Sequence, residues 1–212
     1  MLLPRRLVVL LALVVALAAC GGSGKHQAKA SANGTPKVSN KETDLTVGTV
    51  TVETAGPDVN LGKPQQKAVL AASQTYLDSA VIAPLTSGAV GAGFAPLFDP
   101  SIRGAATGAD NATLTDAPIG KVKKFNQTAS PVAISALADG SGAFVYLASN
   151  FTVNVKATTA DGPATLTKNV ELTFAPAGSK WTVTAYRVTA LRKLPASTAS
   201  STAAQSTGGT SK

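Results

Sequence analysis

The C-terminal half of the chain alternates apolar and polar residues with a period of two, and this pattern constrains the fold more than any other feature. Successive side chains of a β-strand project to opposite faces, so each alternating segment predicts a strand with one buried face. The motifs Asp161-Gly162-Pro163 and Ala177-Gly178-Ser179 supply turns between the segments. We therefore predict successive antiparallel strands. Their apolar positions are Val145, Leu147, Phe151, Val153, Val155, Val170, Leu172, Phe174, Trp181, Val183 and Ala185.

Two further segments have the composition of strands. Residues 132–137 form one of them, closed by the glycine-containing turn at residues 139–142. Residues 45–53 form the other, but their apolar positions change from odd to even around Gly48. A change of parity within a strand indicates a β-bulge or an edge strand.

A helical segment precedes most of these strands. Pro64 suits the first turn of a helix, and the apolar residues after it recur at the spacing of one helical face until Pro84. We predict a helix over residues 64–82 and a brief second helix over residues 90–97. A long helix followed by an antiparallel sheet predicts an α+β fold in which the helix packs on one face of the sheet.

The N-terminus has the features of an export signal. Arg5 and Arg6 provide the positive charge, and the apolar stretch Leu7–Leu17 ends in small residues. This stretch is shorter than the ~20 residues that a membrane-spanning helix needs. We therefore predict a signal peptide over residues 1–19 that is removed on export.

The residues around the predicted cleavage site resemble the lipobox of bacterial lipoproteins. Leu17, Ala18 and Ala19 are the residues that the signal peptidase would recognise, and Cys20 follows them directly. Cys20 is the single cysteine of the chain, so no intramolecular disulfide can form after export. The resemblance implies that Cys20 carries a diacylglycerol anchor, which places the protein on the extracytoplasmic side of the cell membrane.

Composition divides the mature chain into three parts. Residues 20–43 are poor in large apolar side chains and predict a disordered tether, and residues 195–212 predict a disordered tail rich in Ser, Thr and Ala. A single domain is expected over residues 44–194. The net charge of +8 is scattered along the chain, which does not favour nucleic-acid binding. The one tight basic cluster is Lys121, Lys123 and Lys124, for which we expect a solvated strand edge.

The order of these segments resembles the NTF2-like superfamily, whose cone-shaped fold packs helices on a curved antiparallel sheet. The resemblance covers residues 63–192 and depends on the helix from Pro64, the segment 93–100 and the closing strand 180–188. Within that superfamily, an anchored domain of this composition is similar to the Mce-associated proteins. That similarity implies an accessory role in lipid transport, and the superfamily resemblance allows a homodimer paired through the sheets.

The residues needed for several kinds of chemistry are missing from the predicted domain. His26, the single histidine, falls in the tether, so no fixed imidazole is available as a base or a zinc ligand. Lipidation of Cys20 would also remove the thiol. The loop with Asp110, Asn111 and Asp116 does not match the spacing of an EF-hand. We therefore assign no catalytic residue, metal or cofactor.

Two hypotheses about function remain open. The first is a non-catalytic module that binds an apolar ligand or a protein partner in the cell envelope. The second is a small isomerase or lyase for an apolar substrate, as in ketosteroid isomerases, with Asp78 or Asp99 as base and a tyrosine as phenol. The residues that we expect around a pocket are Tyr76, Asp78, Phe94, Phe98, Tyr146, Trp181 and Tyr186.

Overall fold

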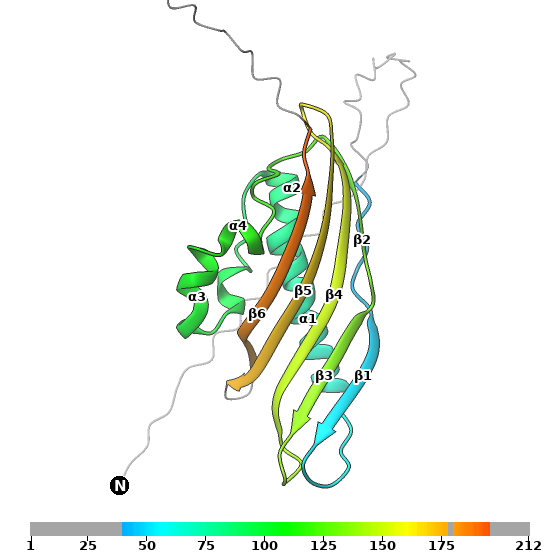
Figure 1. Ribbon diagram of the computed structural model, residues 1–212, viewed down its shortest axis with the longest axis vertical. Coiled ribbons are helices and arrows are strands. Elements are labelled where there is room, and N and C mark those ends of the chain that lie inside the picture. The colour runs from blue at the N-terminus through cyan, green and yellow to red at the C-terminus, as the bar shows by residue number, and fades with distance from the viewer. Residues whose placement is uncertain (1–39, 178–179, 196–212) are drawn as a thin grey trace, which may run out of the picture. The chain divides into compact units, whose positions relative to one another are not determined.

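The computed structural model describes residues 40–177 and 180–195, which form an α+β fold (Figure 1). A sheet of six strands is covered on one face by a long helix, and shorter helices lie beside the last strand. The strands are β1 (Val47–Thr54), β2 (Lys124–Ala129), β3 (Val132–Ala138), β4 (Phe144–Thr158), β5 (Pro163–Ala177) and β6 (Lys180–Lys193). The helical segments are α1 (Lys63–Tyr76), η1 (Leu77–Ile82), α2 (Ala83–Ser87), η2 (Ala95–Leu97), α3 (Pro100–Thr107) and α4 (Asn111–Leu114).

The sheet is mixed, so the prediction of a wholly antiparallel sheet is wrong for one pair of strands. The strand order is β1-β3-β4-β5-β6, and β2 pairs with the other half of β4. The pair β1 and β3 is parallel, whereas β2, β3, β5 and β6 make antiparallel pairs. The helix between β1 and β2 carries the chain back to the end where β1 began, and such a crossover is how parallel strands are joined. The expected irregularity of the first strand is confirmed by a register shift between Val47 and Val50.

The long helix runs over residues 63–87 and continues beyond the predicted end at residue 82. Pro84 does not end it, because the π-helical turn η1 widens the helix directly before this proline. The backbone carbonyls released there are bonded by loops. Ser79 O accepts from the N–H of Gly91, and Ala80 O accepts from the N–H of Asp116, both at 2.8 Å. The proline and the π-helical turn thus fix two loops to the helix.

The region between the long helix and β2 differs from the prediction. The expected helix over residues 90–97 is reduced to the single turn of η2, and α3 and α4 were not predicted. At the start of α3, the Asp99 carboxylate accepts a hydrogen bond of 3.0 Å from the N–H of Ser101, and Pro100 is the first helical residue. Asp followed by Pro is a standard helix start as well as a turn, and the sequence alone did not separate the two.

The inner face of the sheet packs against α1, and Ser73 Oγ of α1 lies 3.0 Å from Ser149 Oγ of β4. The predicted inward-facing positions of β4 and β5 are buried, except that Val145 at the start of β4 is 41% exposed. In β6 the inward-facing positions change from odd to even residue numbers. The cause is a register shift: Phe174 pairs with Val183, but Thr173 pairs with Ala185. The extra residue in β6 places Tyr186 on the inner face.

The start of the domain also differs from the expected boundary at residue 44. The N–H of Lys41 donates to Phe125 O at 3.1 Å, and the N–H of Thr43 donates to Gln127 Oε1 at 2.8 Å. Residues 41–43, which we assigned to the tether, therefore pair with β2.

Candidate functional site

A lysine lies on the inner face of the sheet, where the other positions of the strand are apolar. Lys168 belongs to β5 and alternates inward with Leu166 and Val170, and its side chain is 0% exposed. A buried ammonium is costly unless an opposite charge and hydrogen bonds compensate it. The surroundings of Lys168 therefore form a candidate site.

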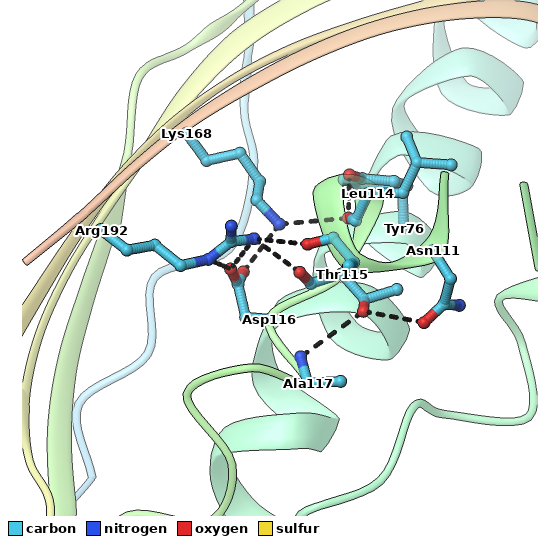
Figure 2. A network of polar contacts seen from close by, with 9 residues as sticks. Tyr76, Asn111, Leu114, Thr115, Asp116, Ala117, Lys168 and Arg192 are labelled. Atoms are coloured by element: carbon cyan, nitrogen blue, oxygen red, sulfur yellow. Dashed lines mark hydrogen bonds and ion pairs between the residues drawn. The ribbon is translucent and has the colours of Figure 1, made fainter. Parts of the chain in front are cut away.

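The compensating charge comes from a loop far away in the sequence. Lys168 Nζ lies 2.8 Å from Asp116 Oδ2, and both side chains are fully buried. Arg192 of β6 approaches the other carboxylate oxygen, with Nε at 3.1 Å and Nη2 at 3.0 Å from Oδ1. Figure 2 shows the two cationic side chains extending from the strands toward this loop.

Backbone carbonyls complete the network and hold the loop on the sheet. Lys168 Nζ donates to Leu114 O at 3.1 Å, and the Tyr76 hydroxyl donates to the same carbonyl (Figure 2). Arg192 Nη2 donates to Thr115 O at 2.7 Å and to Ala112 O at 3.1 Å. Residues 112–116 are therefore fixed from both the helix and the sheet.

Burial changes the titration of two members of the network. Desolvation lowers the pKa of Lys168 to about 8, although the Asp116 carboxylate acts in the opposite direction. Burial also raises the pKa of the Tyr76 phenol above its ordinary value, with the negative charge of Asp116 adding to the effect. Both groups are enclosed by protein, so the arrangement supports the structure and offers no surface to a substrate.

Four of the seven predicted pocket residues lie together as a row of aromatic rings. The ring centroids of Tyr76 and Phe94 are 6.3 Å apart, those of Phe94 and Phe98 are 5.0 Å apart, and those of Phe98 and Tyr186 are 5.5 Å apart. The first three rings are buried, and Tyr186 is partly exposed. Tyr76, Phe94 and Phe98 fill the space between the helices and the sheet, and Tyr186 at the end of the row borders a surface pocket of about 240 Å³.

Tyr186 also connects the row to the short helices. Its hydroxyl donates to Asp110 Oδ2 at 2.7 Å. Desolvation and this hydrogen bond raise the pKa of Tyr186 to about 12. Trp181 is half-buried at the start of β6 and packs against the core.

The other predicted site residues are not brought to the interior. Asp78 is exposed and accepts a hydrogen bond of 2.8 Å from Gln74 Nε2. Tyr146 is 39% exposed on the outer face of β4. Asp99, the other candidate base, caps α3 at the surface, and its hydrogen bonds to Ser101 lower the pKa of its carboxyl. The geometry thus gives a proton-transfer role no support at either aspartate.

The buried network was not predicted, although one signal for it was present. Lys168 occupies an even position of β5, as Leu166, Val170 and Leu172 do. The alternation therefore places it on the apolar face of its strand. Asp116 has no local pattern that marks it as buried. Its partner lies 52 positions away in the sequence, and only the folded chain brings the two together.

The surface carries a groove between β1 and α1. Its volume is about 660 Å³, and its apolar lining includes Val47, Val50 and Leu70. Lys63 and Lys67 of α1 add positive charge to its rim. β1 is an edge strand, and β3 is its strand neighbour in the described part of the chain.

Several predictions concern residues outside the described part of the chain. These are Leu17, Ala18, Ala19, Cys20 and His26, and the anchor therefore stays a prediction. Within residues 40–177 and 180–195, no helix has the length and hydropathy required to cross a membrane. In the same ranges, no three His, Cys, Asp or Glu side chains gather into a metal cluster.

Comparison of the chain with models of protein families, with characterised proteins and with solved structures gives no match.

Proposed function

We propose that the chain is an exported lipoprotein, held on the outer side of the cell membrane by a lipid on Cys20. The support is the charged and apolar N-terminus followed by Leu17-Ala18-Ala19-Cys20. Two acyl chains on one cysteine suffice for stable anchoring, since each buried CH₂ contributes ~0.8 kcal/mol. A single cysteine in an exported chain has its simplest explanation in such an anchor.

We propose that the folded domain is a non-catalytic interaction module of NTF2-like architecture. A helix over residues 63–87 packed on a sheet supports the architecture. One observation carries the non-catalytic assignment: the aromatic row and the buried pair of Lys168 and Asp116 fill the interior, where a substrate would have to bind. The isomerase or lyase alternative has Asp78 or Asp99 as its base, and both lie at the surface. Asp116 is a buried carboxylate, but Lys168 and Arg192 already engage both of its oxygens.

The groove between β1 and α1 is the surface that best suits a partner. An edge strand can accept an extended segment as an additional strand, with backbone hydrogen bonds giving affinity and adjacent pockets giving specificity. Val47 is 36% exposed beside this groove, and Leu70 provides apolar surface next to it. We infer that an extended segment of an envelope protein binds along β1, in an accessory role in lipid transport or envelope maintenance.

The test combines the anchor and the partner in one preparation from the native membrane. A photoreactive amino acid replaces Val47 in one variant and Tyr146 in another, because their exposures of 36% and 39% are matched. We expect a discrete protein adduct from the Val47 position, its loss when Lys67→Glu is added, and no such adduct from the Tyr146 position. Equal labelling at both positions would contradict the binding of a partner along the groove.

Mass spectrometry of the same material tests the other two parts of the proposal. We expect a diacylglycerol mass on Cys20 and its absence in Cys20→Ala. An unmodified Cys20 would overturn the lipoprotein assignment. A stoichiometric apolar passenger on the purified protein would shift the proposal from a protein partner to a lipid ligand.

A further inference from the structure

Lysines from β4, from β6 and from the segment that pairs with β2 form one row across the outer face at one end of the sheet. Lys41 is paired with Asn126, Asn126 with Lys156, Lys156 with Thr165, and Thr165 with Lys193. Directly paired residues of neighbouring strands project from the same face. Strands lie about 4.8 Å apart, so consecutive lysines of this row are separated by roughly 10 Å at their backbones. We call Lys41, Lys156 and Lys193 the basic row.

More positive charge surrounds the basic row. Lys124 begins β2 on the same face, and Lys121 and Lys123 are exposed directly before it. Glu42 and Asp161 lie close in sequence to this end of the sheet and reduce its charge without cancelling it. In the described residues, no ion pair involves Lys41, Lys124, Lys156 or Lys193.

A shallow groove with apolar parts lies among these lysines. Its volume is about 500 Å³, and Lys41, Lys124 and Lys156 contribute to its lining. Phe125, Ala157 and Ala164 also border it, but their side chains belong to the inner face and are only 2–6% exposed, so the groove presents Pro163 and the lysines to solvent. Several lysines on one exposed face match the surface of an anionic bilayer, whose negative potential attracts them.

The chain enters the domain at this same place. Asn40, the first described residue, accepts a hydrogen bond of 3.3 Å from the N–H of Phe125 through Oδ1. Lys41 follows it and belongs to the basic row. Asn40 lies twenty positions after Cys20, and at about 3.5 Å per position the greatest span between them is roughly 70 Å. An anchor on Cys20 therefore keeps this end of the sheet within reach of the bilayer.

We propose that the basic row docks on anionic phospholipid headgroups of the bilayer that holds the anchor. This inference rests on the proposed lipidation of Cys20. Each lysine near an anionic surface strengthens binding roughly fivefold, and the effect decreases beyond the Debye length. The docked basic row turns the opposite end of the sheet, where β3 ends and β4 begins, away from the membrane.

The experiment uses the mature lipidated protein reconstituted in vesicles. The acylated Cys20 has no free thiol, so one introduced cysteine is the single labelling site. Thr165→Cys places a fluorophore within the basic row, and Tyr146→Cys is the control on the same outer face. Tyr146 precedes Lys156 by ten positions along β4, which corresponds to about 34 Å. Quenchers attached to lipid headgroups report which label approaches the surface.

We expect at least tenfold stronger quenching at Thr165→Cys than at Tyr146→Cys in vesicles containing phosphatidylglycerol. The difference should vanish in pure phosphatidylcholine, at 1 M salt, and in a variant with Lys41→Glu, Lys156→Glu and Lys193→Glu. A control with Lys63→Glu, Lys67→Glu and Lys180→Glu has the same charge and should retain the difference. If the protein floats with the vesicles but quenching is equal at both labels, or absent at Thr165→Cys, the docking is overturned and the anchor is not. Failure to float would refute the anchor.

Discussion

Lys168 Nζ and Asp116 Oδ2 lie 2.8 Å apart in the interior, and neither side chain is exposed to solvent. The lysine comes from the middle of β5, and the aspartate comes from the loop that follows α4. Arg192 adds a second cation to the same carboxylate, so the three charges hold the loop against the sheet. This relationship makes the loop between the helices and β2 part of the core.

Removal of the carboxylate charge should be one of the most destabilising single changes in the domain. Asp116→Asn leaves the Lys168 ammonium buried without a counter-charge, which typically costs about 3–5 kcal/mol. We expect a loss of this size in the free energy of unfolding, measured by urea denaturation. A loss below about 1 kcal/mol would show that solvent reaches Lys168.

Replacement of the lysine should be tolerated better than replacement of the aspartate. In Lys168→Met an apolar side chain of similar length fills the space, and Asp116 keeps its contacts with Arg192 at 3.0 and 3.1 Å. Buried ion pairs replaced by apolar groups are often neutral in their effect on stability. The same denaturation series should therefore place Lys168→Met well above Asp116→Asn in stability.

The pKa of Lys168 predicts how stability depends on pH in the alkaline range. The folded protein releases this proton near pH 8, whereas the unfolded chain holds it until about pH 10.5. The unfolded state binds more protons in that window, so this group makes the free energy of unfolding rise as the pH increases. Burial of Tyr76 acts in the opposite direction above pH 10, because its pKa is raised in the folded protein.

The difference between the wild type and Lys168→Met isolates the contribution of the lysine. Denaturation curves collected from pH 7 to pH 10 should show the wild type gaining stability relative to the variant, by at most about 1.4 kcal/mol per pH unit. A constant difference across this range would show that the lysine titrates as it does in water.

The strands were largely predictable from sequence because their pattern is local. The alternation in residues 145–156 and 169–174 assigned the core of β4 and β5, and the turn at residues 161–163 joins them as expected. The parallel pairing of β1 was not predictable in this way, because no local pattern indicates which strand lies beside it. The burial of Asp116 was not predictable for the same reason, because it depends on partners in β5 and β6.

The aromatic row could be identified in part, and its geometry explains where the prediction failed. Phe94 and Phe98 were expected around a pocket, and they belong to the segment 93–100 on which the NTF2-like resemblance depends. The inward orientation of Tyr186 depends on the register shift in β6, which changes the parity of the strand. The alternation predicted Ala185 as an inward position, whereas Ala185 is exposed and Tyr186 faces inward opposite Leu172.

The contact between Tyr186 and Asp110 should contribute measurably to stability. Tyr186→Phe keeps the ring beside Phe98 but removes the hydrogen bond of 2.7 Å to the carboxylate. We expect a loss of about 1 kcal/mol, below the range of a fully buried charged bond because the site is partly exposed. Tyr146→Phe on the outer face is the control and should change stability by less than about 0.5 kcal/mol. Equal effects of the two changes would contradict the role of the hydroxyl.

Two glycines provide a matched test of how the long helix holds its loops. Gly91 donates its N–H to Ser79 O at 2.8 Å, and a Cβ at this position would lie 2.9 Å from Ser79 Cα and 3.3 Å from Ala83 Cβ. Gly91→Ala should therefore push the loop away from the π-helical turn and cost about 1–3 kcal/mol. Gly104 lies inside α3, where an added Cβ meets no atom within 4 Å.

The same substitution should have the opposite sign at these two positions. In Gly104→Ala the chain loses conformational freedom mainly in the unfolded state, which stabilises a helix by about 0.5–1 kcal/mol. Thermal and urea denaturation would measure the free energy of unfolding of both variants, and the two values should differ by more than about 1.5 kcal/mol. If Gly91→Ala were neutral, the loop would not be packed against Ser79, and the π-helical turn would need another explanation than the anchoring of the two loops.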